Sequence, residues 1–348
     1  MHVLIIGAGA LGLLLGGLMV KGGGDVTYIT RTAAQADVLN QTGVVVQTDS
    51  ESSDTYAVRA YPFIHHAGQA RSHLPYTKSV FEETDLVIVT TKQHHVDAVL
   101  PWINRFISKD IPVLFLMNGL GHQEKARQLE HRSIFYGMTQ MGAFKTALNT
   151  VAPRGGGVTK IGSDRFRQKN TLLMGHTGRN DQQADRSTRM PAGIVSFLNL
   201  LRNEGLAVFF SDDIESELWK KCIVNACINP LTALFRVQNG ALIEEPELSR
   251  LMRQLYEEAA RLTAHIKPDE QDAILQKGEL WAEIKQVCRH TAENYSSMLQ
   301  DVQQGRPTEI DAITGYLLSQ AQPRHVAMPY HQFLFDAIRF IEKQYQTV

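Results

Sequence analysis

The sequence predicts an α/β domain built on a buried parallel sheet, followed by an all-helical domain. Three observations lead to this prediction. A short β-branched run at residues 2–6 passes directly into a glycine-rich turn and a helix-like segment. Two further apolar runs, at 85–91 and 112–117, have the composition of strands buried on both faces. From Asp212 to the C-terminus the apolar residues repeat with helical spacing instead.

Length and composition fit a two-domain globular protein. The chain has 348 residues, of which 43% are hydrophobic and 20% charged, and a domain usually holds roughly 100–200 residues. We place the boundary near Ser211, with a first domain at 1–210 and a second at 211–348. The formal net charge of −1 gives no whole-chain attraction for nucleic acid or an anionic membrane, so we expect neither as a partner.

The glycine-rich turn has the spacing of a dinucleotide-binding motif. It reads GAGALG over residues 7–12, between the first strand-like run and a helix-like segment, and a second strand-like run follows at 26–30. Gly7 would make the tight turn, Gly9 would let the backbone approach a pyrophosphate, and Gly12 would let helix and strand pack closely. A glycine turn without a ligand is the alternative. The context predicts a Rossmann-type domain whose cofactor contacts are Gly7, Ala8, Gly9, Ala10, Leu11 and Gly12.

The end of the second strand-like run favours NADP(H) over NAD(H). An NAD site usually has Asp or Glu there, about 20 residues after the motif, to bind the ribose 2′-hydroxyl. This chain has Thr30 and Arg31 instead. A guanidinium can pair with a 2′-phosphate, and no carboxylate stands there to repel it. We predict that Arg31 binds the 2′-phosphate of NADP(H); the alternative is a solvated loop arginine.

Two features bear on the compartment. Residues 3–20 carry no charge, as in a membrane span or signal peptide, but no basic segment precedes them and five of them are glycine. The cysteines are Cys222, Cys227 and Cys288, with no further pair and no nearby histidine cluster. This pattern is typical of reduced core thiols and not of disulfides or a zinc site. We expect a cytoplasmic protein with no bound metal.

Polar residues follow the next two predicted strands. Lys92 comes after the run at 85–91, and Asn118 comes after the run at 112–117. Ligands of open α/β sheets bind at the carboxyl ends of the strands. We therefore expect Lys92 and Asn118 beside the ribose and nicotinamide, although a solvated lysine and an ordinary Asn-Gly turn would have the same sequence.

The middle of the chain gives weaker signals. Residues 134–210 look strand-like, with a glycine turn at 154–157. Two stretches, 48–79 and 163–190, are strongly polar. We interpret the first as an elaborated connection and the second as an exposed, mobile excursion without chemistry of its own.

The first long helix of the second domain carries a polar stripe. Residues 219–234 are mostly apolar, but Lys221, Asn225 and Asn229 recur every four residues and so share one helix face. A buried unpaired amide costs roughly 1–3 kcal/mol and a buried charge costs more. The stripe must therefore face a ligand, a water-filled groove or a dimer contact.

A second polar segment lies nearer the C-terminus. On a helix, Asn294, Ser297 and Asp301 would share one face. A Gly-Arg-Pro break would end that helix, and Thr308 would cap the next one with Glu309 in its first turn. Taken alone, these residues also fit an ordinary helix surface and an N-terminus stabilised by the helix dipole.

Several of these segments occur together and in a recognisable order. They are GAGALG at 7–12, TK at 91–92, NG at 118–119, WKKCIVNACINPLTAL at 219–234, NG at 239–240 and SSMLQDVQQGRPTEIDAITGY at 296–316. Over nearly the whole chain this order resembles the ketopantoate reductase family, within the 6-phosphogluconate-dehydrogenase-like superfamily. The departures are Thr314, where the family often has Asn, and the two polar stretches.

The resemblance implies a reaction and a set of residues. The reaction is the NADPH-dependent reduction of 2-dehydropantoate to pantoate, a precursor of pantothenate and coenzyme A. Lys221 falls on the family's catalytic lysine, and Glu309 falls on a glutamate beside the active site and cofactor. The residues near the nicotinamide half are Lys92, Asn118 and Ala143. The implied substrate-binding residues are Asn225, Asn229, Asn239 and Ser297, and Asn294 joins them through the face that it would share with Ser297.

The chemistry agrees with the stripe, but alternatives remain open. Hydride transfer to a ketone leaves negative charge on its oxygen, so a lysine whose pKa is lowered by burial would serve as proton donor. A related reductase of another 2-ketoacid, carbonyl or imine would have the same architecture. A non-catalytic NADP(H)-binding regulator is a third possibility, which loss of Lys221 or Glu309 would have favoured. Helical second domains of this kind often pair, so we expect a homodimer.

Overall fold

The chain divides into two units, and the division does not follow the sequence strictly. The structure is a computed structural model that describes residues 1–48, 52–63, 76–131, 133–163, 190–266 and 279–345. The N-terminal unit comprises Met1–Met117 and His122–Ile214, and the C-terminal unit comprises Asn118–Gly121 and Glu215–Val348. The short segment Asn118–Gly121 therefore belongs with the helices that follow it much later in the chain.

An eight-stranded sheet forms the centre of the N-terminal unit. Its strands, in spatial order, are β12 (Val208–Phe210), β11 (Thr159–Gly162), β8 (Ile134–Thr139), β7 (Val113–Leu116), β6 (Leu86–Val89), β1 (His2–Ile6), β2 (Asp25–Thr30) and β5 (Arg59–Pro62). All neighbouring strands are parallel except β8 and β11. Every residue of β1, β6 and β7 is buried. The predicted buried parallel sheet is confirmed.

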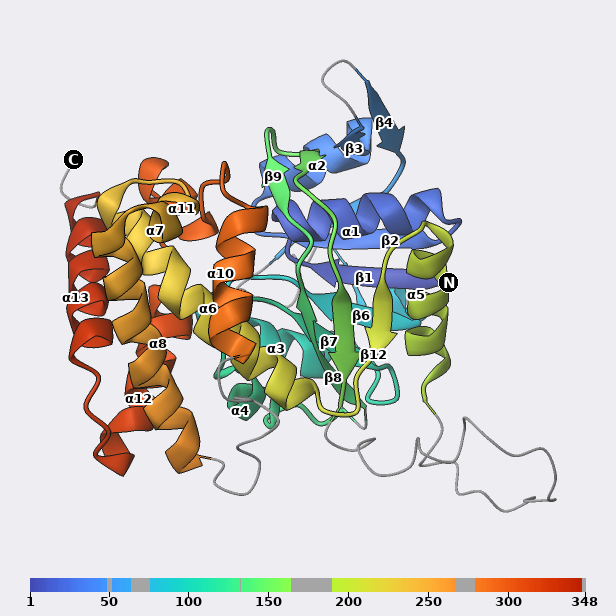
Figure 1. Cartoon of the computed structure of the whole chain (residues 1–348). Helices are drawn as coiled ribbons and strands as arrows, with labels where there is room; N and C mark the ends of the chain where they lie inside the picture. Colours follow the sequence, from blue (N-terminus) through green and yellow to red (C-terminus); the bar gives the residue numbers. More distant parts are fainter. Residues whose placement is uncertain (49–51, 64–75, 132, 164–189, 267–278, 346–348) are drawn as a thin grey trace, which may run out of the picture. The chain divides into compact units, whose positions relative to one another are not determined.

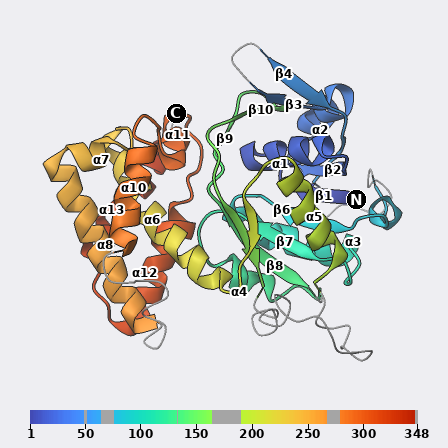
Figure 2. The same cartoon turned by 45° about the vertical axis from the view of Figure 1, so that its right-hand side comes forward.

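Helix α1 (Ala10–Lys21) lies between this sheet and a smaller one. The smaller sheet has the order β4 (Ser53–Tyr56), β3 (Val44–Gln47), β10 (Thr150–Pro153) and β9 (Ala143–Lys145). Helix α1 contacts β1 and β2 of the large sheet and β3, β9 and β10 of the small sheet, as Figure 1 and Figure 2 show. The other helices of this unit are α2 (Ala33–Thr42), α3 (Val96–Phe106), α4 (His122–Ala126) and α5 (Ala192–Asn203), with 3₁₀ turns at Lys78–Phe81 and Gln93–His95.

The uncharged run at 3–20 is part of this unit's core. It divides into β1 and the apolar helix α1, whose Leu13, Leu15 and Met19 are completely buried. Burial in this core explains why the run carries no charge, without a membrane span or a signal peptide. None of the described helices is long and apolar enough to cross a membrane.

The prediction for the middle of the chain is only partly right. Five short strands, β8 to β12, lie in the described part of 134–210, but α5 precedes the last of them. Helix α5 buries Ile194, Phe197, Leu198 and Leu201, whose three- and four-residue spacing is helical. The strand-like reading was therefore wrong there. Of the two polar stretches, the first contains β4, β5 and a 3₁₀ turn, and residues 49–51, 64–75 and 164–189 lie outside the described part of the chain.

The C-terminal unit is helical, as the apolar spacing predicts. Its helices are α6 (Ile214–Phe235), α7 (Ala241–Glu244), α8 (Pro246–Ile266), α10 (Glu279–His290), α11 (Ser297–Gln303), α12 (Tyr316–Ala321) and α13 (Pro329–Gln344), with a π-helical turn at Asp311–Gly315 and a 3₁₀ turn at Gln322–Arg324. Helix α6 buries apolar side chains on most of its surface. The cysteines Cys222, Cys227 and Cys288 are free and buried, as expected of core thiols.

One helix prediction is wrong in a way that matters for the site. Asn294 does not share a helix with Ser297, because α10 ends at His290 and α11 begins only at Ser297. The hydroxyl of Ser296 accepts a hydrogen bond from the Leu299 N–H at 3.1 Å and so caps α11. A capping serine starts a helix because its oxygen satisfies a backbone donor of the first turn. Asn294 lies in the connection before this cap.

Candidate active site

The glycine-rich turn has the backbone constraints that its sequence predicts. Gly7 has φ +112°, a region that residues with a side chain rarely adopt. A Cβ at Gly12 would overlap the Gly7 carbonyl oxygen, so only glycine fits where α1 passes the turn. Thr90, which directly follows β6, donates a hydrogen bond from its hydroxyl to the same oxygen at 2.7 Å. The turn is thus fixed from both sides.

Gly9 differs from the other two glycines because its surroundings are open. It is exposed and caps α1 with φ −78°, and a Cβ there would meet no atom of the protein within 4 Å. No side chain caps this helix, and its first turn holds no acidic residue. The first N–H groups of a helix lack partners within the helix and attract anions. The turn therefore fits the pyrophosphate of a dinucleotide.

Two side chains that the sequence analysis missed hold this turn. The Ala8 carbonyl accepts hydrogen bonds from Gln35 Nε2 at 2.8 Å and from Lys145 Nζ at 3.1 Å. Gln35 lies in α2, and Lys145 ends β9 of the small sheet. No local pattern connects these residues to the turn, since Gln35 reaches it through the packing of α2 on β2 and β5, and Lys145 through the packing of β9 on α1.

The other predicted cofactor residues of the N-terminal unit end or begin regular elements. Arg31 is exposed and directly follows β2, while Thr32 caps α2 by accepting a hydrogen bond from the Gln35 N–H. Lys92 is partly buried before the 3₁₀ turn that follows β6. Ala143 is the first residue of β9. Arg31 and Lys92 thus follow the carboxyl ends of neighbouring parallel strands on either side of β1, where dinucleotides bind in this class of sheet.

The C-terminal unit brings three predicted residues into one chain of hydrogen bonds. Lys221 Nζ donates to Asn118 Oδ1 at 2.9 Å, and Asn118 Nδ2 donates to Glu309 Oε2 at 2.9 Å. The amide thus links the ammonium to the carboxylate. Its oxygen can only accept a hydrogen bond and its nitrogen can only donate one, which matches the two partners. Lys221 lies 103 positions after Asn118 in the sequence, and Glu309 lies 191 positions after it.

Asn118 reaches Lys221 because its neighbours pack on the C-terminal unit. Gly119 has φ +78°, and a Cβ there would press on Ala312. The Leu120 N–H donates to the Ala312 carbonyl at 2.9 Å. The position of Asn118 after a buried strand predicted a place beside the nicotinamide; in the structure its side chain is joined to Lys221 and Glu309.

Burial changes the acidity of the lysine. It lowers the pKa of Lys221 from the ordinary value of 10.5 to about 8, while the negative charge of Glu309 acts in the opposite direction. Desolvation disfavours the charged ammonium, and an opposite charge restores part of its stability. Lys221 can therefore hold and release a proton near neutral pH.

The rest of the polar stripe lies along α6. Asn225 is partly buried and Asn229 is 7% exposed. Thr232 Oγ1 lies 3.0 Å from the Asn229 carbonyl oxygen and 2.7 Å from Ser296 Oγ. This buried hydroxyl, which the sequence analysis missed, ties the stripe to the start of α11. Ser297 is the first residue of that helix, and its side chain is exposed.

The two remaining candidates are tied to each other. The Asn239 N–H donates to the Asn294 carbonyl at 3.0 Å, and Asn239 Nδ2 donates to Thr291 Oγ1 at 2.9 Å. Within the described part of the chain, the buried Asn239 Oδ1 has no hydrogen-bond partner. Among the described residues, no group of three or more His, Cys, Asp or Glu side chains could hold a metal ion.

Comparison with known proteins identifies the family. The family described as "Ketopantoate reductase PanE/ApbA" matches residues 3–165, and its C-terminal counterpart matches residues 213–342. The 2-dehydropantoate 2-reductase of Bacillus subtilis is 30% identical, with 100% of both chains covered. The chain belongs to the ketopantoate reductase family. The 2-dehydropantoate 2-reductase of Vibrio cholerae is 29% identical, with 99% of both chains covered.

Solved structures agree with this assignment to the ketopantoate reductase family. A crystal structure of a probable 2-dehydropantoate 2-reductase from Bacillus subtilis superposes with a TM-score of 0.71 at 29% identity, covering 98% of this chain and 100% of that one. A ternary structure of D-mandelate dehydrogenase with NADH and anilino(oxo)acetate gives 0.78 at 23% identity, covering 99% and 100%. The second likeness shows the fold alone.

Proposed function

We propose that this chain reduces 2-dehydropantoate to pantoate with NADPH. The observation that carries the proposal is the hydrogen-bonded chain from Lys221 through Asn118 to Glu309. It gives a lysine with a pKa of about 8 a fixed orientation. The full-length likeness to named 2-dehydropantoate 2-reductases supports the choice of substrate. A cytoplasmic location and a homodimer remain predictions from the sequence.

In this proposal the glycine turn and Arg31 hold the cofactor. The open space at Gly9 and the N-terminus of α1 fit the pyrophosphate. The exposed guanidinium of Arg31 would pair with the 2′-phosphate, and Lys92 would bind the nicotinamide half. NADPH, when bound, supplies the hydride that is added to the carbonyl carbon of the ketoacid.

Lys221 supplies the proton. As the C=O double bond gives up its π electrons to the oxygen, the Lys221 ammonium donates one proton to that oxygen, which leaves pantoate with a hydroxyl and Lys221 as a neutral amine. The Asn118 oxygen accepts from Nζ and so fixes the direction of the remaining protons. Glu309 accepts a hydrogen bond from Asn118 Nδ2 and so keeps the amide oxygen directed at Lys221. Its negative charge also favours the charged form of the lysine before the proton transfer.

The asparagines and Ser297 would hold the rest of the substrate. Within the described part of the chain, no hydrogen bond involves the Asn225 or Asn229 side chain, so both amides can bind the carboxylate or hydroxyl of the ketoacid. Asn239 Oδ1, which is buried without a partner among the described residues, would accept from a hydroxyl. The exposed Ser297 hydroxyl would bind the carboxylate at the N-terminus of α11.

The direct test is the oxidation of NADPH in the presence of 2-dehydropantoate. The control reactions use NADH in place of NADPH, and other 2-ketoacids in place of 2-dehydropantoate. We expect rapid turnover with NADPH and 2-dehydropantoate. Turnover of a different 2-ketoacid, without turnover of 2-dehydropantoate, would show that the chain is a related reductase with another substrate. Tight NADPH binding without any turnover would favour a regulatory role.

The rate of reduction should fall as pH rises through about 8. The protonated form of Lys221 is required for reduction, and its pKa of about 8 places the loss of that form in this window. Above it, kcat/KM should decrease about tenfold per pH unit. Oxidation of pantoate by NADP⁺ requires the neutral amine, so its rate should rise through the same window. A pair of pH–rate profiles checks both signs, and a reduction rate that stays constant to pH 10 would contradict the role of Lys221.

Replacing Arg31 with Ala should weaken NADPH binding and leave NADH binding nearly unchanged. A charge-assisted hydrogen bond to phosphate contributes about 1.5–3 kcal/mol, so the Kd for NADPH should rise roughly 10- to 150-fold. Fluorescence titration with both cofactors measures the two constants. Arg59→Ala, which removes an exposed arginine from β5, serves as the matched control. An equal rise in the Kd values for NADH and NADPH would show that Arg31 does not bind the 2′-phosphate.

A further inference from the structure

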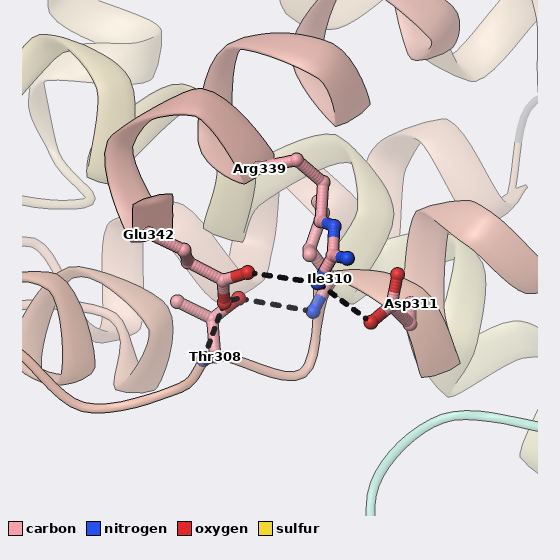
Figure 3. Close-up of polar contacts among 5 residues, drawn as sticks. All are labelled: Thr308, Ile310, Asp311, Arg339 and Glu342. Carbon is pink, nitrogen blue, oxygen red and sulfur yellow. Dashed lines mark hydrogen bonds and ion pairs between the residues drawn. The ribbon is translucent and has the colours of Figure 1, made fainter. Parts of the chain in front are cut away.

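A carboxylate near the end of α13 holds the segment that carries Glu309. Glu342 Oε1 accepts hydrogen bonds from the Thr308 N–H and from the Thr308 hydroxyl, both at 2.7 Å. Figure 3 shows the two side chains facing each other across the turn that precedes Ile310. Thr308 is buried and the Glu342 side chain is only 13% exposed. Hydrogen bonds to an ionised acceptor in such a setting are short and strong.

The same cluster fixes the backbone on the other side of Glu309. Thr308 Oγ1 accepts from the Ile310 N–H at 3.2 Å. Arg339 Nη1 lies 3.2 Å from Glu342 Oε2 and 3.3 Å from Asp311 Oδ2 (Figure 3). Both neighbours of Glu309 are therefore bound, directly or through Thr308, to side chains of α13.

The Glu309 backbone and side chain continue the network toward the lysine. Its carbonyl oxygen accepts hydrogen bonds from the Ala312 and Ile313 N–H groups at 3.1 and 3.0 Å, at the start of the segment that contains the π-helical turn. Its carboxylate accepts from Asn118, whose oxygen accepts from Lys221. A shift of this backbone would move the carboxylate away from the Asn118 amide.

We propose that Glu342 is a positioning residue for the reduction. By holding Thr308 it keeps Glu309 within hydrogen-bond distance of Asn118, and so keeps the amide that orients the Lys221 ammonium. Glu342 itself contacts neither Lys221 nor Asn118 in any of its hydrogen bonds described above. The expected fall in kcat rests on the proposed function, whereas the effect of Glu342 on the position of Glu309 does not.

Glu342→Ala should lower kcat and change the pH profile. A displacement of about 1 Å in a group that orients the reaction can cost about 10²-fold in rate, so we expect kcat to fall about 10- to 100-fold with little change in the KM for NADPH. The negative charge of Glu309 raises the pKa of Lys221 against the effect of burial. Loss of the Glu309 contact should therefore move the high-pH decline in the rate to lower pH. A purely structural loss of stability would not move it.

Two variants on the same contacts make the interpretation specific. Glu342→Gln keeps an oxygen that can accept from both Thr308 donors, so it should restore the rate and pH profile to within about threefold of wild type. Asp336→Ala removes a different carboxylate of α13, which is exposed and accepts from Gln332 at 3.0 Å. It should behave as wild type.

The decisive measurement is the titration of Lys221 itself. In protein with ¹³C-labelled lysine, the Lys221 ε-carbon signal is assigned by its disappearance in Lys221→Arg. We expect this signal to titrate at lower pH in Glu342→Ala than in Asp336→Ala, and at the wild-type position in Glu342→Gln. Coincident titrations of Glu342→Ala and Asp336→Ala would overturn the proposal. If Glu342→Ala does not fold, Thr308→Val, which removes one of the two donors, is judged by the same criterion.

This measurement separates the two proposals. If the wild-type protein does not turn over 2-dehydropantoate, the proposed function fails, while the Lys221 titration still reports whether Glu342 positions Glu309. If the wild-type protein is active and the titration does not move, the positioning role of Glu342 fails alone.

Discussion

Replacing Lys221 with Ala is expected to lower kcat for 2-dehydropantoate reduction by about 10²–10⁴-fold, the usual contribution of a positioned proton donor. The variant removes the ammonium and leaves the Asn118 amide without its donor. NADPH binding should change little, because the proposed function assigns it to the glycine turn and Arg31. Steady-state kinetics with a separate NADPH titration measure the two effects.

Two further variants test what the lysine does. Lys220→Ala removes the preceding lysine of the same helix, which is likewise partly buried, and should keep the wild-type rate. Lys221→Arg keeps a positive charge, but a guanidinium with a pKa above about 12 does not release its proton near neutral pH. It should bind the ketoacid and turn it over slowly. A Lys221→Ala enzyme as active as Lys220→Ala would remove Lys221 from the mechanism.

Replacing Gly9 with Asp is expected to abolish useful NADPH binding without harming the fold. The backbone at Gly9 has φ −78°, which any residue adopts, and a Cβ there meets no atom of the protein within 4 Å. Asp is also a favoured helix cap, so thermal unfolding should stay unchanged or rise slightly. A carboxylate about 4 Å from a phosphate charge costs about 4 kcal/mol at an effective dielectric constant of 20, so the Kd should rise about 10²- to 10³-fold.

Gly12→Ala is the contrasting variant for this prediction. A Cβ at Gly12 overlaps the Gly7 carbonyl and crowds the Thr90 hydroxyl, so it should lower the unfolding temperature as well as the affinity. Fluorescence titration with NADPH and a thermal melt of each variant give both quantities. A Gly9→Asp protein that binds NADPH like wild type would show that the pyrophosphate lies elsewhere.

The parts of the fold that were predictable depend on local chemistry. Gly7 is required by its positive φ, and Gly12 by its close approach to the Gly7 carbonyl. Both requirements arise within a short stretch of chain, so the spacing of the glycines in the sequence indicates them. The buried strands and α6 show their burial in continuous or periodic apolar residues. The stripe on α6 likewise indicated that its face is not ordinary core, although not what it contacts.

The parts that failed depend on contacts distant in sequence or on a single cap. The helix through Asn294 was a reasonable reading of spacing, but the hydroxyl of Ser296 sets the start of α11. No local pattern places Asn118 with helices that lie about a hundred residues later, or pairs Thr308 with Glu342, which are 34 positions apart. Helix α5 is different: its periodicity was present in the sequence and was outweighed by the polar stretch before it.

The assignment of Asn118–Gly121 to the C-terminal unit means that the chain crosses between the units three times, once before this segment, once after it and once at Ile214. The residue that accepts a hydrogen bond from Lys221 is therefore encoded far upstream of the helices it serves. A gene fusion or recombination event that transfers only the helical half would carry the lysine and Glu309 but leave their common partner behind. A helical half separated from residues 118–121 would therefore lack the amide that joins Lys221 to Glu309.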